Sequence, residues 1–589
     1  VKKVRKPEGQ GLNDLYVRFF RMAERRIAEK TGQGIICFIS NYSWLDGLSF
    51  TGMRERYLEV FDAIRIDSLN GDAYRTGKVA PDGTPDPSIF STDHNREGIQ
   101  VGTAITTLVR KQESTPCNEV EVRNLWGQKK HQILLDSAGV SAEKLYEGVE
   151  PSMALGLPYL AAAVSTSYFD WPSLSELLPA SFPGVKTSRD EFLVDVDEQA
   201  LQNRIIDYFD ASIPDDVIRE KYPSILNNAG RFDGPAIRMK LKARGIAPGN
   251  FVRYLYRPLD ARWLYWEPDT KLLDEKRSEY FSHIFEGNFW IEAREKQTKE
   301  DFNRGTVTSV LADNFGSGLS TFFPAYLRET HSNGDNGLVE KRPNLLKSVE
   351  DKLSEIGLGV EDLFHHIVSV LHSPMYRAEN AGALRMDWPR VPFPEKPAVL
   401  TASAELGRQL AALMEPEKPV SGVTIGVRAE LKALGVPSKV GGGDLAANDF
   451  ALAAGWGSAQ KGGIVMPGRG KAISREYTPT EVAAFGAGSG PLGMTPSQII
   501  DLLGGETLDI YLNADAYWRN VPEKVWTYKL GGYQVIKKWL SYREKDILGR
   551  PLKPEEVQEV TNMIRRIAAI LLLTPSLDDN YAKAKAAVL

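Results

Sequence analysis

The first 115 residues alternate between amphipathic and fully apolar segments. Leu15, Phe19 and Met22 share one face of residues 12–31, which predicts an amphipathic helix. The run IICFIS at 35–40 is apolar throughout, as is typical of a buried parallel strand. The same criteria predict a helix and two further strands at 48–60, 63–69 and 101–111. This order is that of the second half of a doubly wound sheet, so we predict an incomplete, Rossmann-like α/β domain whose first half is missing.

The pattern changes after residue 115. Helical and strand segments are mixed from there to about 400, and residues 400–420 hold a short helix followed by a connector. Residues 436–493 are rich in Gly and Ala and have little periodicity, whereas 551–573 form an amphipathic helix with acidic first turns. We therefore predict a larger α+β region after the α/β part, and three divisions of the chain at 1–115, 116–400 and 401–589.

The composition is that of an ordinary globular protein. Charged residues make up 25% of the 589 residues and the hydrophobic set 42%, which excludes wholesale disorder and fibrous proteins. Two cysteines, Cys37 and Cys117, are too few for a disulfide framework, and Cys37 is expected in the core with its apolar strand. No apolar run approaches the roughly 18 residues that span a bilayer, and no signal peptide is recognisable. We therefore expect no membrane partner and a cytoplasmic location.

The net charge of −5 conceals an uneven distribution. Residues 186–220 carry ten acidic and four basic residues, whereas residues 238–262 carry seven basic residues and one acid, Asp260. The aromatic residues among and after these basic ones are Tyr254, Tyr256, Trp263, Tyr265 and Trp266. Basic side chains neutralise phosphates and aromatic rings stack on bases, so this segment is the best candidate for nucleic-acid binding. The alternative is a solvated helix followed by a strand whose aromatic residues belong to the core.

Other chemical motifs are weak. The densest histidines are His365, His366 and His372, but no carboxylate stands at ligand spacing and no CxxC or HExxH occurs, so we predict core or capping histidines and no metal. The glycines of FGAGSGP at 485–491 follow a polar stretch and precede a proline, which favours a surface loop over a cofactor loop. Neither a P-loop nor a nucleophile elbow is present.

Several longer strings resemble a known family. GIICFISNYSWLDGLSFTGMRE at 34–55, with FDAIRIDSL and IQVGTAITTLVRK after it, is similar to the distal half of a γ-class amino-methyltransferase domain. More specifically, the chain resembles type ISP restriction-modification enzymes. The resemblance continues through YRPLDARWLYW, FFPAYL, LFHHIVSVLHSPMYR, DWPRVPFP, VPEKVWTYKLGGYQVIKKWLSYRE and IRRIAAILLLTPSLDDNY. These strings cover nearly the whole chain in order.

This resemblance implies a function. Members of the family join nuclease, helicase, adenine-N6 methyltransferase and target-recognition parts in one chain, and their C-terminal specificity domain reads the DNA sequence. Duplex DNA is therefore the implied partner, together with the missing N-terminal methyltransferase half, helicase and nuclease parts. The intact enzyme is expected to use S-adenosylmethionine, but the family's F-x-G-x-G loop and N-P-P-Y motif precede the start of this chain. We therefore expect no cofactor-binding residue in this chain and no methylation, cleavage or translocation by it alone.

The resemblance also directs the choice of site residues. Phe90 matches the aromatic residue that stacks on the extruded adenine, although a polar stretch separates it from Ile99. For DNA contact we predict Arg253, Arg257 and Arg262, with phosphate contacts from Lys240, Lys242, Lys537 and Lys538. Two alternatives stay open, namely a stand-alone DNA-binding module and a methyltransferase acting on RNA or protein.

Overall fold

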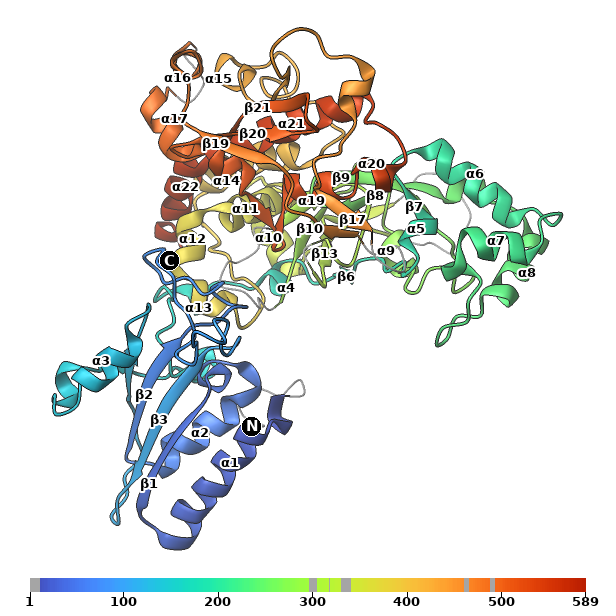
Figure 1. Ribbon diagram of the computed structural model, residues 1–589. Coiled ribbons are helices and arrows are strands. Elements are labelled where there is room, and N and C mark those ends of the chain that lie inside the picture. The colour runs from blue at the N-terminus through green and yellow to red at the C-terminus, as the bar shows by residue number, and fades with distance from the viewer. Residues whose placement is uncertain are drawn as a thin grey trace. The chain divides into compact units, whose positions relative to one another are not determined.

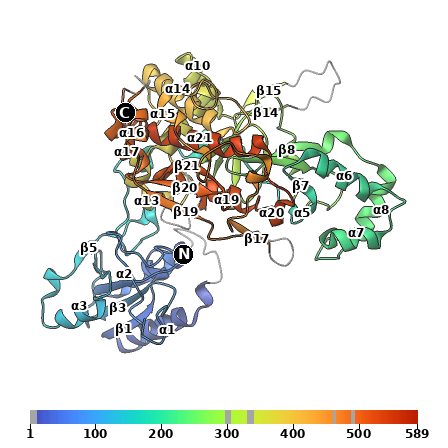
Figure 2. The ribbon, with the colours of Figure 1, turned by 45° about the horizontal axis from the view of Figure 1, so that its top comes forward.

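The computed structural model describes residues 11–295, 305–316, 318–329, 340–459, 465–487 and 493–588. These residues form two compact units, which are described separately (Figure 1 and Figure 2). Unit 1 holds the described residues up to Thr166, together with Glu295 and Ala378–Asp387. Unit 2 holds Ser167–Arg294 and the remaining described residues.

Unit 1 is built on one mixed sheet. Its strands are β1 Gly34–Asn41, β2 Ala63–Asn70, β3 Thr103–Arg110, β4 Val120–Asn124 and β5 Glu147–Val149. Its helices are α1 Leu15–Glu24 (continued by a π-helical segment, Arg25–Thr31), α2 Thr51–Val60, α3 Lys130–Asp136 and α13 Ala381–Leu384. The spatial order is β1-β3-β2-β4-β5, in which only β2 and β4 run parallel. The predicted order of elements over the first 115 residues is confirmed, and the sheet continues beyond residue 115 through β4 and β5.

The prediction that β1 is a buried parallel strand is wrong. Within the described sheet, β1 is an edge strand that pairs antiparallel with β3. Ile36 is buried with Phe20 of α1, whereas Ile35 and Ile39 alternate onto the other face and are 67% and 52% exposed. Cys37 lies on the same face and is exposed, so its expected core position is also wrong. A continuous apolar run cannot distinguish one covered face from two, because every second side chain of a strand points away from the first face.

The described part of unit 2 contains three four-stranded sheets. The first has the order β11-β10-β13-β6 and the second the order β12-β8-β9-β7. Their strands are β6 Phe182–Pro183, β7 Val194–Asp195, β8 Phe251–Arg257, β9 Asp260–Tyr265, β10 Trp290–Ala293, β11 Thr306–Thr308, β12 Leu311–Ala312 and β13 Thr321–Pro324. The third sheet has the order β16-β21-β20-β19, and its strands are β16 Val436–Lys439, β19 Ala472–Arg475, β20 Thr507–Tyr511 and β21 Ala516–Pro522. Short pairs complete the set: β14 Tyr326–Arg328 with β15 Lys341–Pro343, β17 Gly457–Ala459 with β18 Val465–Pro467, and β22 Lys529–Leu530 with β23 Tyr533–Gln534.

Helices lie between these sheets in the sequence. Those before residue 300 are α4 Leu174–Leu177, α5 Asp190–Leu193, α6 Glu198–Phe209, α7 Asp215–Lys221, α8 Gly234–Arg244 and α9 Ser278–Phe281. Those of the middle region are α10 Lys347–Glu355, α11 Val360–His372, α12 Pro374–Glu379, α14 Pro397–Met414 and α15 Ala429–Lys432. Those near the C-terminus are α16 Pro479–Gly486, α17 Pro496–Leu503, α18 Glu523–Trp526, α19 Val535–Ser541, α20 Lys545–Leu548, α21 Pro554–Leu572 and α22 Thr574–Ala586. The predicted amphipathic C-terminal helix is confirmed in α21, which has Glu555 and Glu556 in its first turn.

The glycine-rich segment forms regular structure on either side of its undescribed residues. β16 and β19 belong to the third sheet, and α16 ends at Gly486. Gly488 and Gly490 of the expected surface loop lie outside the described residues. Among the described residues no single helix meets the length and hydropathy expected of a membrane span, and only the bent pair α21 and α22 meets them together.

The three histidines of α11 occupy buried positions. The Nε2–H of His366 donates to the carbonyl of Pro392 at 2.7 Å, and Nδ1 is hydrogen-bonded to Ser403 Oγ at 2.7 Å. Complete burial lowers the pKa of His366 to about 4, so the imidazole is neutral at physiological pH. The prediction of core histidines is confirmed, because His365 and His372 are also buried. In the described part of the chain no group of His, Cys, Asp or Glu has a metal-binding arrangement.

A buried ion triad joins two segments of unit 2 that are far apart in the sequence. Arg262 donates to Asp260 Oδ2 at 2.6 Å, and Arg543, which follows α19, donates to Asp260 Oδ1 at 2.7 Å. All three side chains are nearly or completely removed from solvent. Burial acts to raise the pKa of Asp260, but the two guanidinium groups hold it below its usual value. The carboxylate therefore stays ionised and fixes β9 to the C-terminal region.

Replacing Asp260 should destabilise unit 2. Asp260→Asn leaves two buried guanidinium groups without their counter-charge, and we expect a loss of about 3–5 kcal/mol in the free energy of unfolding. Denaturant unfolding followed by tryptophan fluorescence measures this change. Asp269→Asn is the matched control, because this carboxylate is exposed beside Arg244 and should change stability by less than about 1 kcal/mol. Equal effects of the two variants would contradict the role of the triad.

Candidate DNA interface

The loop between β2 and β3 carries Phe90, and a buried aspartate organises it. Asp86 accepts the backbone N–H of Gly71 at 2.7 Å through Oδ2 and that of Gly127 at 2.7 Å through Oδ1. The buried ammonium of Lys130 lies 2.8 Å from Asp86 Oδ1. One carboxylate thus ties the start of the loop to the segment after β4. These contacts anchor the loop to the rest of unit 1.

A second aspartate fixes the other end of the same loop. Asp72 accepts the N–H of Gly102 at 2.9 Å, immediately before β3, and the N–H of Tyr74 at 2.7 Å. Gly102 is required here, because a Cβ at this position would lie 2.3 Å from the ring of Tyr42. Phe90 is 41% exposed on this loop, and its N–H donates to Ser88 Oγ at 3.2 Å. Its ring is therefore accessible to a partner that approaches the loop.

Four of the predicted DNA-contact residues lie on two segments that the fold of unit 2 brings together. Arg257 and Arg262 come from β8 and β9, whereas Lys537 and Lys538 come from α19. Three of them, together with neighbouring tyrosines, form a basic–aromatic cluster, which consists of Tyr256, Arg257, Arg262, Tyr533, Lys538 and Tyr542. The Tyr256 and Tyr542 rings pack edge to face with centroids 5.3 Å apart.

Cations lie over the tyrosine rings of this cluster. The guanidinium carbons of Arg257 and Arg262 are 4.1 and 4.0 Å from the ring centroid of Tyr256. The ammonium of Lys538 is 4.7 Å from the centroid of Tyr542 and 5.3 Å from that of Tyr533. Ring faces attract cations, so these contacts hold three positive groups close together despite their mutual repulsion.

Carboxylates neutralise the buried side of the cluster. Arg257 donates to Asp313 Oδ1 at 3.0 Å, and the hydroxyl of Tyr256 donates to Asp190 at 2.7 Å. Burial raises the pKa of Asp313 to about 6, although the guanidinium of Arg257 acts to lower it. Asp313 is consequently ionised above neutral pH and keeps Arg257 paired. Arg262 is paired with Asp260 of the buried triad.

The remaining predicted DNA-contact residues differ in whether they form an ion pair with an acidic side chain. Arg253 on β8 forms an ion pair with Glu417 at 2.6 Å and lies 4.7 Å from the ring centroid of Trp263. Lys242 on α8 lies 3.7 Å from Asp215. Lys240 on α8 is exposed, and Lys537 on α19 is partly exposed. Neither of these two lysines is in an ion pair with another described residue, so their ammonium groups are the freest of the set.

Residues that sequence reasoning missed complete this region. Tyr533 and Tyr542 line the basic–aromatic cluster, and Arg543 supplies the third member of the buried triad. A signal was present, because aromatic and basic residues alternate in YQVIKKWLSYREK as they do in FVRYLYRPLDARW. What the pattern could not show is that the two segments meet.

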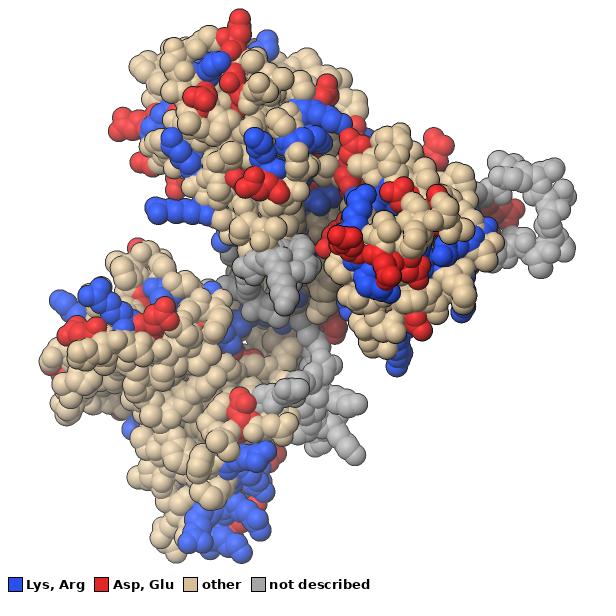
Figure 3. All heavy atoms as spheres, turned by 45° about the vertical axis from the view of Figure 1, so that its right-hand side comes forward, with Lys and Arg blue, Asp and Glu red and all other residues tan. Residues whose placement is uncertain are grey.

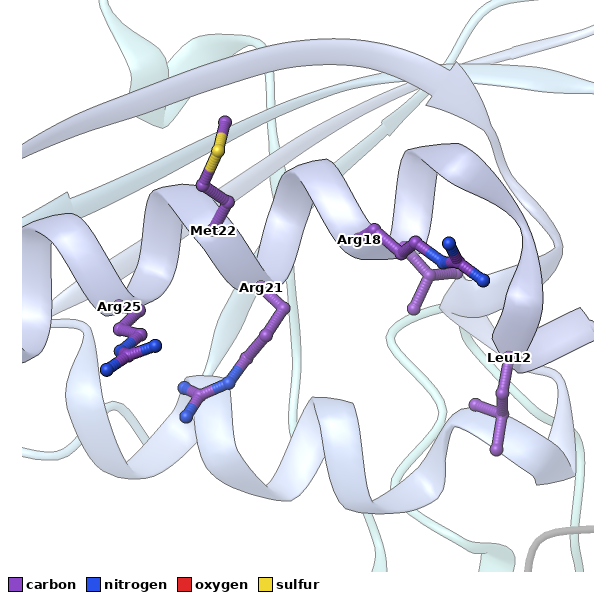
Figure 4. A pocket seen from close by; sticks show the side chains of 6 residues that line it. Leu12, Arg18, Arg21, Met22 and Arg25 are labelled. Atoms are coloured by element: carbon purple, nitrogen blue, oxygen red, sulfur yellow. The ribbon is translucent and has the colours of Figure 1, made fainter.

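Unit 1 also has a shallow depression beside α1. It measures about 490 Å³ and is lined by Leu12, Val17, Arg18, Arg21, Met22 and Arg25 (Figure 4). Arg21 and Arg25 both pair with Glu29, at 3.0 and 3.3 Å. The described side chains that line it are arginines and apolar groups. Figure 3 shows basic side chains gathered at the lower end of this unit, whereas both signs of charge are intermixed over the visible face of unit 2.

Comparison with known proteins identifies the larger part of the chain. The model of the Type ISP C-terminal specificity domain matches residues 176–563, which is more than half of the chain. The chain belongs to this family. The matched part of the specificity domain includes α8, both segments of the basic–aromatic cluster and the buried triad. No curated protein sequence matches the chain.

Several solved structures are similar in fold to this chain. The ATP-dependent Type ISP restriction-modification enzyme LlaBIII bound to DNA has a TM-score of 0.57 and 17% identity, over 98% of this chain and 35% of that one. A nuclease-deletion mutant of the Type ISP enzyme LlaGI, in complex with a DNA substrate mimic, has a TM-score of 0.56 and 18% identity, over 98% and 41%. A DrdV–DNA complex has a TM-score of 0.56 and 19% identity, over 98% and 53%. The chain thus spans about a third to a half of the length of these proteins.

The burial of Arg257 predicts that this residue contributes more to the stability of unit 2 than the partly exposed Lys537 does. Arg257→Ala leaves Asp313 without its counter-charge, so we expect the free energy of unfolding to fall by about 3 kcal/mol or more. Lys537→Ala removes a partly exposed side chain and should change stability by less than about 0.5 kcal/mol. Denaturant unfolding of both variants measures the difference. Wild-type stability of Arg257→Ala would contradict a structural role for the Arg257–Asp313 pair.

Proposed function

We propose that this chain is the sequence-reading part of a type ISP restriction-modification enzyme and that unit 2 binds duplex DNA. The observation that carries the proposal is the specificity-domain match over residues 176–563. The three structural neighbours are complexes with DNA or a DNA substrate mimic, which supports DNA as the partner. The net charge of −5 is no obstacle, because phosphate contacts need only a local group of cations.

The residue roles in this proposal follow the availability of their donors. Lys240, Lys537 and Lys538 are proposed phosphate contacts, because they are exposed or partly exposed and none is in an ion pair with another described residue. Arg253 is a proposed DNA contact, and it gives up its ion pair with Glu417 when it binds the nucleic acid. Arg257, Arg262 and Lys242 are also proposed DNA contacts. Each must give up an ion pair with a carboxylate to bind DNA, so these contacts cost more free energy than those of the unpaired lysines.

We further propose that unit 1 belongs to an adenine-N6 methyltransferase domain of the parent enzyme. The exposed apolar side chains of Ile35 and Ile39 on the edge strand β1 support it, because such a surface suits further strands and helices of the same domain. S-adenosylmethionine supplies the methyl group in such enzymes, but no F-x-G-x-G loop or N-P-P-Y occurs in this sequence. We therefore place its binding residues outside this chain, together with the ATP-dependent cleavage machinery.

The binding proposal is tested by the salt dependence of affinity. Neutralising phosphates releases counterions, so the logarithm of the association constant should fall linearly with the logarithm of salt concentration, by about 0.9 for each phosphate contacted. Fluorescence anisotropy with a labelled duplex measures this slope for the full chain. The RNA duplex of the same sequence is the control, and we expect weaker binding to it. Equal or tighter binding to RNA would favour an RNA-directed enzyme, and no salt-dependent binding to duplex DNA would refute the proposal.

A role of Phe90 in stacking on a flipped adenine is tested in the full-length parent. Phe90→Ala should lower the methylation rate, because stacking on an extruded base contributes about 1–3 kcal/mol. It should leave the affinity for DNA nearly unchanged. Tyr74→Ala is the matched control, since Tyr74 is an exposed aromatic residue of the same loop. Methyl transfer from labelled S-adenosylmethionine is the measurement. Equal losses in the two variants would indicate a loop-folding effect instead of stacking.

A further inference from the structure

The third sheet of unit 2 has one covered and one open face. Trp518 of β21 points inward, is buried, and donates its Nε1–H to the carbonyl of Val557 in α21 at 3.3 Å. Ile510 of β20 lies opposite Trp518 in the register and is also buried. Side chains alternate along a strand, so Tyr517 and Arg519 lie on the other face. The open face carries polar and cationic groups that the sheet core does not use.

A cation and two aromatic rings are stacked on this open face. Tyr511 lies opposite Tyr517 in the antiparallel register, and their rings are 5.2 Å apart at an angle of 21°. The ammonium of Lys471, which immediately precedes β19, lies 3.8 Å from the centroid of the Tyr511 ring. The N–H of Tyr511 donates to the carbonyl of Lys471 at 3.0 Å, which fixes the backbone below this contact. The flexible lysine is thus held at a defined place on the sheet.

Two cations on the open face have no acidic partner among the described residues. Lys471 and Arg519 are both exposed, and neither is in an ion pair with another described residue. Asp509, an acid on the same face, is already paired with Arg475 at 3.0 Å. Nothing among the described residues neutralises the two cations, so the face attracts an anion.

The side-chain groups that remain free on the open face indicate which kind of partner it binds. The rings of Tyr511 and Tyr517 stack on each other, and Lys471 takes up a further face of Tyr511, so the aromatic surface left for bases is small. The groups that remain are an ammonium, a guanidinium and two hydroxyls, all of which donate hydrogen bonds. Phosphate oxygens only accept hydrogen bonds and carry the negative charge that the two cations require. A surface with several hydrogen-bond donors, positioned by two stacked aromatic rings, therefore suits a nucleic-acid backbone better than unstacked bases.

We propose that Lys471, Tyr511, Tyr517 and Arg519 form a second DNA-contact surface, which binds the phosphate backbone of the duplex. This surface shares no residue with the basic–aromatic cluster, and the sequence analysis did not predict any of its residues as a DNA contact. The inference rests on the proposed function, since it assumes that unit 2 binds DNA. It adds a place where the protein holds DNA without reading its bases.

The test is a charge-removing double variant of the full chain. Lys471→Gln with Arg519→Gln should weaken binding to a labelled random-sequence duplex by about tenfold at moderate salt and reduce the salt slope by about 2, one unit for each lost phosphate contact. The loss should be the same on a duplex that contains the recognition sequence, because phosphates carry no sequence information. Both positions are exposed, so the thermal unfolding midpoint should not change.

A matched control and three outcomes make the test decisive. Lys545→Gln removes an exposed, unpaired lysine from α20 and should leave affinity and slope unchanged. If the wild-type chain binds duplex DNA with a salt-dependent affinity and the double variant binds equally well, the inference is overturned while the proposed function stands. A loss confined to the recognition sequence overturns the phosphate role. If the wild-type chain does not bind duplex DNA, the proposed function fails first.

Discussion

The buried carboxylate of Asp260 is the constraint on which the architecture of unit 2 depends. It holds Arg262 from its own strand and Arg543 from a segment 283 residues further along the chain. Both guanidinium groups are removed from solvent, and each is stabilised by a hydrogen-bonded ion pair with this one carboxylate. The triad therefore fixes the distance between β9 and α19, and with it the place where Tyr256, Tyr533 and Tyr542 meet. The basic–aromatic cluster exists because this ion group joins the two segments.

Arginine has two uses in this protein. Inside unit 2, Arg262 and Arg257 balance buried carboxylates and lie over tyrosine rings, so their donors serve the framework. At the surface, lysines and arginines such as Lys240 and Arg519 are exposed and form no ion pair with another described residue. A local excess of basic residues in the sequence therefore does not measure the charge that a partner encounters. The measure is the number of cations that remain after internal pairing.

The two units differ in how completely they bury their apolar surface. In unit 2 the core cluster encloses aromatic and aliphatic residues from α6, β8, β9 and β10. In unit 1, α1 and α2 pack on one face of the sheet, whereas Ile35 and Ile39 of the edge strand stay exposed on the other. An exposed row of aliphatic residues on an edge strand is costly in water, and this exposure is the observation that supports the proposal of a larger domain.

The sequence by itself determined the local elements, because they follow from side-chain periodicity. It predicted the helix and strand order of the first 115 residues, the amphipathic helix that became α21, the buried positions of His365, His366 and His372, and the strings typical of the type ISP family. It could not decide which face of β1 is covered, because the pattern IICFIS is the same for one covered face and for two. Nor could it separate Arg262 from Lys537 as DNA contacts. Only the tertiary structure showed that Asp260 neutralises Arg262 while Lys537 remains unpaired among the described residues, since an ion pair depends on distances between segments and not on their composition.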